Sequence, residues 1–353
     1  MPEPPVSRNA PQNNSISNAK IAENHNFLKF LSQKTFSSVY DIIFSDMKKN
    51  SSPKSFNPTE IIFACTTLCN LRCAHCFVNR LTTKLNAEDA KKLILSCKNN
   101  PESQIDKIGF SGGEPFLALD FMAETIKFAR ENDFMFDQIM TNGDWWKTES
   151  ELRETLQKIC DAGYDGKIGV SYDNFHAQNY ERIRTFCKTV NEIFGEENLT
   201  IQAVADPLLD EENSEKLEAE LNTLSEDFAA DIFILPQTFQ GDDEHGWQSK
   251  KWFKEDFCEG PGQILFVHPT GDIAPCCGFA NENKELFIGK ITDSFEKIMG
   301  NAKENKMIQA CFCNGLLKHA KELEKSGEKL PAKARTADIC TFCDFLCKHG
   351  GIK

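Results

Sequence analysis

The sequence predicts an α/β protein, a partial (β/α)6 TIM-like barrel followed by a C-terminal cysteine-rich domain. From Thr59 to about Pro236, apolar strand-like runs alternate with amphipathic helical patterns, which is typical of a parallel sheet covered by helices. Six such units are too few for a closed eight-fold barrel, so we expect an open one. Eight of the 15 cysteines then follow residue 250, which indicates a second kind of domain.

The chain divides into three predicted parts: 1–57, 58–245 and 246–353. The first 20 residues are rich in Pro, Asn and Ser and are expected to form a disordered tail. Residues 24–48 carry apolar side chains at helical spacing, which predicts one or two amphipathic helices.

Each element of the barrel has a local signal. Asn86 is a helix cap, and Ala90, Leu93, Ile94 and Cys97 follow it at the spacing of one helical face. Further helices are expected over 119–129, 149–162, 178–194 and 211–228. The expected strands are EIIFAC (60–65), KIGFS (107–111), FDQIMT (136–141), KIGVSYD (167–173), TIQAVAD (200–206) and DIFILP (231–236).

Composition limits the function classes. A net charge of −13 disfavours broad binding to phosphate backbones, so no nucleic-acid partner is expected. The sequence shows neither a secretory signal nor an apolar run long enough to span a membrane. A cysteine-rich chain of this kind is expected in the cytoplasm, with reduced thiols that bind metal.

The first cysteine run has the spacing CxxxCxxC. Cys69, Cys73 and Cys76 follow the first predicted strand and can turn three thiolates toward one point. One interpretation is a zinc site completed by Cys65 or His75. The other is a [4Fe–4S] cluster that leaves one iron open to a ligand. We interpret Cys65 as a small buried residue of the strand.

The segment SGGEP follows the second strand, and its Gly112 and Gly113 allow close approach of the backbone to a ligand. Together, CxxxCxxC and GGEP resemble the radical S-adenosylmethionine (SAM) superfamily, over about residues 59–240. The resemblance implies that Cys69, Cys73 and Cys76 hold a [4Fe–4S] cluster whose open iron binds SAM and that a 5′-deoxyadenosyl radical is formed. It also implies that Gly112, Gly113 and Glu114 lie at SAM, with the Glu114 carboxylate on its ammonium group.

Two further strand ends carry polar residues. In TNGDWW and SYDNFH, the resemblance implies that Thr141, Asn142 and Ser171 contact SAM, as does Phe77 beside the cysteine run. Asp173 and His176 are candidates for substrate contact or acid–base chemistry. The alternatives are a strand-ending turn at TNG, a helix N-cap at Asp173 and a surface histidine.

The C-terminal cysteines follow a second pattern. Cys258, twelve residues, Gly271, four residues and Cys276 resemble the signature of SPASM and twitch domains, with Gly271 in a hairpin turn. The resemblance implies one auxiliary [4Fe–4S] cluster held by Cys258, Cys276, Cys340 and Cys343. A zinc site is the alternative. The later spacing departs from the signature and leaves Cys311, Cys313 and Cys347 without a role.

Cys277 directly follows a predicted cluster ligand. Neighbouring side chains of an extended segment point to opposite faces, so Cys277 should face away from the cluster, toward the barrel mouth. A free thiol there could donate a hydrogen atom to a carbon radical. The alternative is a buried structural cysteine.

Four segments, SYDNFH, TNGDWW, TGDIAPCC and DICTFC, resemble the radical SAM peptide epimerases of the epipeptide pathway. The resemblance implies conversion of L- to D-residues in a ribosomally made precursor peptide, with Cys277 as hydrogen-atom donor and a flavodoxin or ferredoxin as reductant. Two alternatives stay open: a maturase that forms thioether or carbon–carbon crosslinks, or a small-molecule dehydrogenase or epimerase. A non-catalytic electron-transfer module is a third, which GGEP disfavours.

Overall fold

The structure is a computed structural model that describes residues 55–78, 80–206, 208–235, 257–258, 262–328 and 339–348. All of them belong to one compact unit, Ser52–Lys353. The predicted tail, the helices expected over 24–48 and the boundary expected between 245 and 246 lie outside the described residues. The three-part division of the chain therefore stays a prediction.

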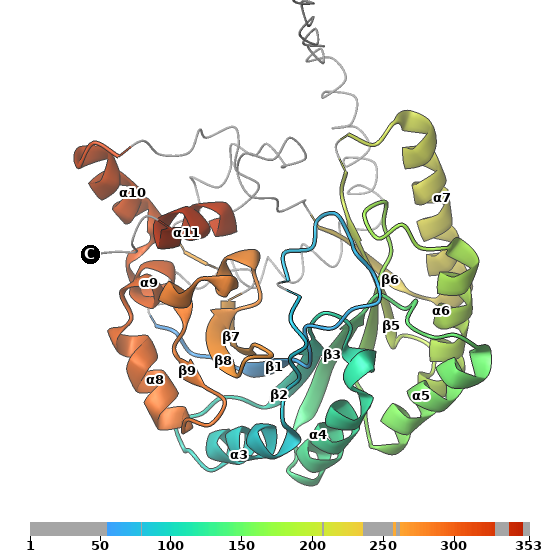
Figure 1. Cartoon of the computed structure of the whole chain (residues 1–353), viewed down its shortest axis with the longest axis horizontal. Coiled ribbons are helices and arrows are strands. Elements are labelled where there is room, and N and C mark those ends of the chain that lie inside the picture. Colours follow the sequence, from blue (N-terminus) through green and yellow to red (C-terminus); the bar gives the residue numbers. More distant parts are fainter. Residues whose placement is uncertain are drawn as a thin grey trace, which may run out of the picture. The chain divides into compact units, whose positions relative to one another are not determined.

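The predicted alternation of strands and helices is confirmed. Each strand pairs in parallel with the next, so that their carboxyl ends share one edge of the sheet. The helices follow one another along the outer side of the curved sheet (Figure 1). In order, the elements are β1 (Glu60–Ala64), α3 (Ala87–Lys98), β2 (Lys107–Ser111), η1 (Pro115–Ala118), α4 (Leu119–Glu131), β3 (Met135–Thr141), α5 (Glu149–Asp161), β4 (Lys167–Ser171), α6 (Tyr180–Phe194), β5 (Leu199–Val204), α7 (Glu211–Phe228) and β6 (Asp231–Leu235).

The sheet extends beyond the six predicted strands. β7 (Gly262–Val267) pairs in parallel with the free edge of β1, and β8 (Asp272–Cys276) and β9 (Gly289–Lys290) add antiparallel strands. The described strands form one sheet in the order β6-β5-β4-β3-β2-β1-β7-β8-β9, in which β6 and β9 are the two edges. The barrel is therefore open, as predicted.

Short helices and turns complete the C-terminal part. Gly271 has φ of +81° in the turn between β7 and β8, which confirms the predicted hairpin. The remaining elements are η3 (Phe279–Glu282), η4 (Lys284–Leu286), α8 (Phe295–Glu304), α9 (Lys306–Gln309), the π-helical turn η5 (Ala310–Asn314), α10 (Leu316–Lys325) and α11 (Ile339–Lys348).

Helix starts follow from local side-chain chemistry. The Asn86 side chain accepts hydrogen bonds from the backbone N–H groups of Glu88 and Asp89, which confirms the predicted cap of α3. Thr148 and Asn179 cap α5 and α6 in the same way, so α6 begins two residues later than expected.

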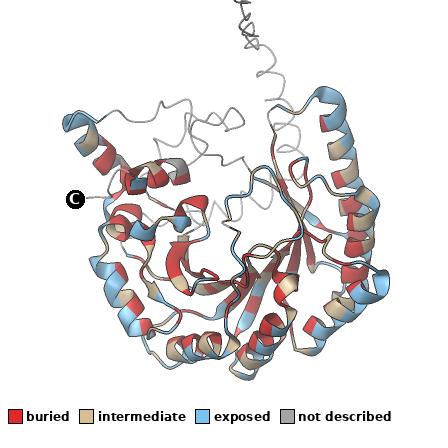
Figure 2. Cartoon of the chain, viewed as in Figure 1, coloured by how far each residue is buried: buried red, intermediate tan, exposed pale blue. Residues whose placement is uncertain are grey.

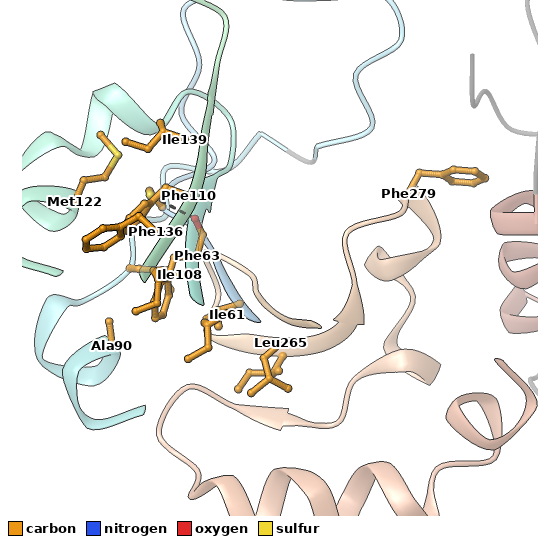
Figure 3. Close-up of a cluster of buried hydrophobic side chains, with 14 of the residues drawn as sticks. Ile61, Phe63, Ala90, Ile108, Phe110, Met122, Phe136, Ile139, Leu265 and Phe279 are labelled. Carbon is orange, nitrogen blue, oxygen red and sulfur yellow. Dashed lines mark hydrogen bonds between the residues drawn. The ribbon is translucent and has the colours of Figure 1, made fainter. Parts of the chain in front are cut away.

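The main core lies between the sheet and its helices. Buried residues line the inner sides of the helices, whereas their outer sides are exposed (Figure 2). Ile61 and Phe63 of β1 point into this core (Figure 3). The Phe63 ring packs edge-on against that of Phe121 of α4, with ring centroids 5.9 Å apart. Because side chains alternate along a strand, Glu60 and Ile62 lie on the opposite, concave face of the sheet.

Candidate functional site: the concave face of the sheet

The loop between β1 and α3 carries the first cysteine run. Cys69, Cys73 and Cys76 all lie on this loop, and none forms a disulfide. The loop runs on the concave side of the sheet (Figure 1). Cys65 is fully buried at the end of β1, and its thiol donates a hydrogen bond to the Phe63 carbonyl. Its predicted burial is confirmed, although it directly follows the last residue of β1, and three thiols are left on the loop.

The GGEP segment packs directly against this loop. The N–H groups of Gly113 and Glu114 donate hydrogen bonds to the carbonyls of Thr66 and Leu68, both 2.7 Å long. A Cβ atom on Gly113 would lie 2.3 Å from the Leu68 oxygen, and Gly112 has φ of +136°. These glycines are therefore needed for contact with the cysteine loop, a reason that their sequence pattern alone did not show.

Glu114 joins the ends of β2 and β3. Its carboxylate is fully buried and accepts hydrogen bonds from the Thr141 hydroxyl (2.7 Å), the Asn142 N–H (2.9 Å) and the Phe116 N–H (3.2 Å). Burial raises its pKa to about 7, although these three hydrogen bonds act in the opposite direction. A carboxylate has about four acceptor positions, so capacity for one further donor remains.

Asn142 connects the end of β3 to the cysteine loop. Its side-chain amide donates to the Asn70 side chain (2.9 Å) and to the Cys69 sulfur (3.7 Å). Ser171 is the last residue of β4 and is half-buried. Thr141, Asn142 and Ser171 thus stand at the carboxyl ends of neighbouring strands, next to the loop that carries the predicted cluster ligands.

Asp173 organises the segment after β4. One carboxylate oxygen accepts from the Phe175 N–H, the His176 N–H and the His176 ring, and the other accepts from the Val204 N–H of β5 (2.9 Å). Burial alone would raise the Asp173 pKa, but the hydrogen bond and charge of His176 hold it below its usual range. Asp173 is therefore a buried turn cap rather than the cap of α6.

His176 links this turn to the cysteine loop. Its Nδ1 atom lies 2.7 Å from the Asp173 carboxylate, and the Cys73 thiol also interacts electrostatically with its ring. Burial lowers the His176 pKa, but these two contacts outweigh burial and raise it to about 10. The His75 ring lies 4.8 Å from the His176 ring, between centroids. His176 is thus held between elements and is not the surface histidine of the alternative interpretation.

The second group of cysteines lies around the β7–β8 hairpin. Cys276 ends β8 and pairs in register with Gly262, and the Cys258 sulfur lies 3.2 Å from the point where a Cβ atom of Gly262 would be. Cys258 and Cys276 are buried, as are Cys340 and Cys343 of α11. All four predicted ligands of the auxiliary cluster are thus in the interior of the C-terminal part.

Cys276 and Cys277, which are neighbours in the sequence, differ in exposure. Cys276 is buried, whereas solvent reaches Cys277. Protein nevertheless surrounds Cys277 on most sides, and burial together with the charge of Glu60 raises its pKa to about 11.

The expected direction of Cys277, toward the barrel mouth, is wrong. Cys276 pairs with Gly262, two residues before Ile264, which pairs with Glu60 at the amino end of β1. Cys277 therefore lies near the amino ends of the strands, opposite the ends that carry the cysteine loop. Because β8 runs antiparallel to β7, the last residue of β8 lies beside the amino end of β7.

Phe279 connects the two ends of the concave face. It lies two residues after Cys277 and, in Figure 3, well apart from the side chains between the sheet and the helices. Its ring packs edge-on against that of Phe77 in the cysteine loop, with centroids 6.4 Å apart. Phe77 is 46% exposed, so its ring is accessible for the predicted contact with SAM.

Glu60 is a candidate functional residue that the sequence analysis did not single out. It faces the same side of the sheet as Cys277, and one of its carboxylate oxygens is buried without a hydrogen-bond partner among the described residues. The available signal was a charged residue at an alternating position of the otherwise apolar strand EIIFA.

Comparisons with known proteins agree with this arrangement. A model of the radical SAM superfamily matches residues 64–194, and a model of the SPASM iron–sulfur cluster-binding domain matches residues 258–343. The chain carries a radical SAM domain followed by a SPASM domain. These domains imply a [4Fe–4S] cluster with SAM and auxiliary iron–sulfur clusters. The three loop thiols and the buried C-terminal thiols are donors of the type that such clusters take.

Two curated relatives and one solved structure give the extent of similarity. The chain is 29% identical over 150 residues to S-adenosylmethionine-dependent nucleotide dehydratase RSAD2 of Oncorhynchus mykiss, covering 39% of this chain but only 42% of that protein. It is 22% identical over 292 residues to putative peptide biosynthesis protein YydG of Bacillus subtilis (strain 168), covering 79% and 88%. The structure of native anSMEcpe with bound AdoMet and a Cp18Cys peptide has a TM-score of 0.52 to this chain at 14% identity. The match covers 83% of this chain and 97% of anSMEcpe, and it shows that the two chains share a fold.

Among the described residues, no helix has the length and apolar character that crossing a membrane requires.

Proposed function

We propose that this protein is a radical SAM peptide epimerase that converts L- to D-residues in a ribosomally made peptide. The observation that carries the proposal is the pair Cys276 and Cys277, one buried among the thiols of the SPASM domain and the other open to solvent beside Glu60. The relative with the longer match, YydG, is named for peptide biosynthesis, which supports a peptide substrate.

In the proposed radical-forming site, Cys69, Cys73 and Cys76 hold the SAM-binding cluster. Thr141, Asn142, Ser171, Phe77 and the segment Gly112–Glu114 line the SAM pocket. When bound, SAM and the clusters supply a 5′-deoxyadenosyl radical and the electron that later restores the donor thiol. The chain's own contribution is positional: Asn142 contacts Cys69, and His176, held by Asp173, contacts Cys73.

Cys277 is the proposed hydrogen-atom donor. The α-hydrogen atom of the L-residue would pass to the 5′-deoxyadenosyl radical, giving 5′-deoxyadenosine. The Cys277 S–H bond would then break and a C–H bond would form on the opposite face of the α-carbon. The resulting thiyl radical needs one electron and one proton to become a thiol again. For this role the α-carbon must lie between the cysteine loop and Cys277, which stand at opposite ends of one face of the sheet. His176 is proposed to contact the substrate, and the buried Asp173 carboxylate holds its ring in place.

The test uses the full-length, cluster-loaded protein with SAM, a reductant and a short peptide encoded beside its gene. In D2O, the epimerised residue should gain one deuterium at its α-carbon, because thiol hydrogens exchange with solvent. Cys277→Ala should still form 5′-deoxyadenosine but no D-residue. Epimerisation that persists in Cys277→Ala would exclude the proposed donor.

The mass of the product separates the alternatives. In H2O, epimerisation leaves the mass unchanged, whereas crosslinking or dehydrogenation removes two hydrogens. A product lighter by two hydrogens would therefore favour a role of the SPASM domain as electron acceptor from the substrate radical.

A further inference from the structure

The Glu60 carboxyl group lies on the concave face of the sheet, beside Gly109 of β2. A Cβ atom on Gly109 would come within 2.7 Å of Glu60 Oε1 and 3.4 Å of Ile62 Cγ1. The Glu60 side chain therefore leans from the amino end of β1 across the neighbouring strand, where the glycine leaves room for it. An apolar side chain would fill this space at a lower cost of desolvation, so the carboxyl group calls for a functional explanation.

The hydrogen-bonding capacity of this carboxyl group is not used within the described part of the chain. Glu60 Oε1 is buried and has no hydrogen-bond partner among the described residues. A buried oxygen without a partner is costly, which indicates that something outside the fold satisfies it. The residue as a whole is only partly buried, so its side chain remains accessible to a ligand.

The groups around Glu60 favour its protonated form at neutral pH. Its titratable neighbours are Lys107 on β2, Asp137 on β3, Tyr164 before β4 and Cys277 after β8, whereas β7 has no titratable side chain. Burial and the charge of Asp137 raise the Glu60 pKa to about 8, and Lys107 offsets this only in part. A carboxylic acid that is held neutral can donate an O–H hydrogen bond, which a carboxylate cannot do.

Glu60 and Cys277 reach the same region of the concave face from two different strands. Glu60 pairs in register with Ile264 of β7, and Cys276 pairs with Gly262, two residues before Ile264. The charge of Glu60 also acts on the Cys277 thiol. A peptide α-carbon placed at the Cys277 sulfur therefore has its neighbouring backbone carbonyl close to the Glu60 carboxyl group.

We propose that Glu60 binds the peptide substrate, with its carboxyl O–H donating a hydrogen bond to the backbone carbonyl next to the α-carbon that is epimerised. The contact holds this carbon at Cys277, and it acts on the carbonyl oxygen onto which an α-carbon radical delocalises. Every peptide residue has this carbonyl, so the contact positions the substrate without selecting a side chain. The inference rests on the proposed function and adds a substrate contact outside the radical-forming site.

Binding of the peptide encoded beside the gene is measured first, with cluster-loaded protein and SAM but without reductant, so that no reaction occurs. Glu60→Leu removes both oxygens and should weaken binding about tenfold at about pH 7. Glu60→Gln should bind as the wild type does, because its amide N–H also donates a hydrogen bond. At about pH 9, above the Glu60 pKa, binding by the wild type should weaken, whereas binding by Glu60→Gln should not.

Asp137→Asn is the matched control. It keeps the Glu60 side chain, so binding at neutral pH should be unchanged. Because the charge of Asp137 helps to raise the Glu60 pKa, this variant should lose affinity at a lower pH than the wild type does. With reductant added, epimerisation should follow binding, with the wild type and Glu60→Gln above Glu60→Leu.

Equal binding by Glu60→Leu and the wild type at neutral pH would overturn the inference. So would binding by Glu60→Gln that is as weak as that by Glu60→Leu, because a hydrogen-bond donor would then not suffice. If Glu60→Leu does not fold, as judged by circular dichroism, the pH comparison of Glu60→Gln with the wild type decides, and equal weakening of both at high pH would overturn the inference. A wild-type protein that shows the expected binding but forms no D-residue would contradict the proposed function and leave the Glu60 contact supported.

Discussion

At the scale of single residues, Glu60 places a carboxylate on the concave face of the sheet. Burial, and then the charge of Asp137, raise its pKa to about 8. A glutamate with a raised folded-state pKa stabilises the fold below its ordinary pKa of about 4.5, and this contribution is lost as the pH rises to about 8. We therefore expect the free energy of unfolding to fall across this range, with Glu60 contributing on the order of 2 kcal/mol after allowance for partial exposure.

Urea unfolding at several pH values measures this effect. Glu60→Gln should flatten the decrease between about pH 5 and 8, because glutamine does not ionise. Glu102→Gln replaces an exposed glutamate and should leave the pH profile as in the wild type. An equal slope in the Glu60→Gln and wild-type proteins would show that ionisation of Glu60 does not control the decrease.

Residue-level prediction succeeded where chemistry is local. Alternation along an extended segment predicts that Cys276 and Cys277 face opposite sides, and the two residues differ in exposure. It could not predict the end of the barrel at which Cys277 lies, because that depends on the register of β8 against β7. Nor could spacing reveal the contact between Cys311 and Cys343, because it brings together residues 32 positions apart.

At the scale of elements, the contact between the GGEP segment and the cysteine loop sets the position of the predicted cluster ligands. Gly113→Ala would place a methyl group against the backbone of Leu68, which cannot move without displacing the loop. We expect a loss of about 2 kcal/mol in the free energy of unfolding and lower iron occupancy of the SAM-binding cluster. Chemical denaturation and iron analysis check these effects.

A matched glycine is available in helix α8. Gly300 has no atom within 4 Å of the position that a Cβ would take, so Gly300→Ala should stabilise the protein by about 0.5–1 kcal/mol, as in other helices. Similar stabilities for the Gly113→Ala and Gly300→Ala proteins would contradict the tight packing between the two segments.

The elements of the barrel could be predicted because each has its own pattern. The strands and helices from β1 to β6 follow from apolar runs, helical periodicity and caps such as Asn86. The place of β7 could not be predicted. Its run QILFV is typical of a strand, but nothing in it specifies that its partner is β1, which lies some 200 residues earlier.

At the scale of the whole described unit, pairing of β1 with β7 makes one sheet of strands from the radical SAM and SPASM domains. Residues Glu60–Phe63 pair with Ile264–Val267, and Ile61, Phe63, Leu265 and Val267 are all fully buried. Loss of β7 would therefore leave an unpaired strand edge at β1 and expose apolar side chains. The two strands should open in one cooperative step.

Hydrogen exchange of the cluster-loaded protein at increasing urea concentrations tests this cooperativity. Peptides that contain β1 and β7 should lose protection at the same urea concentration, because each strand supplies hydrogen-bond partners to the other. β6 is the edge of the described sheet at its other end and serves as the control, which should exchange at lower urea. If β7 exchanged well before β1, the C-terminal strands would be an independent unit that docks on a complete barrel edge. The shared sheet would then not hold Cys277 rigidly opposite the cysteine loop.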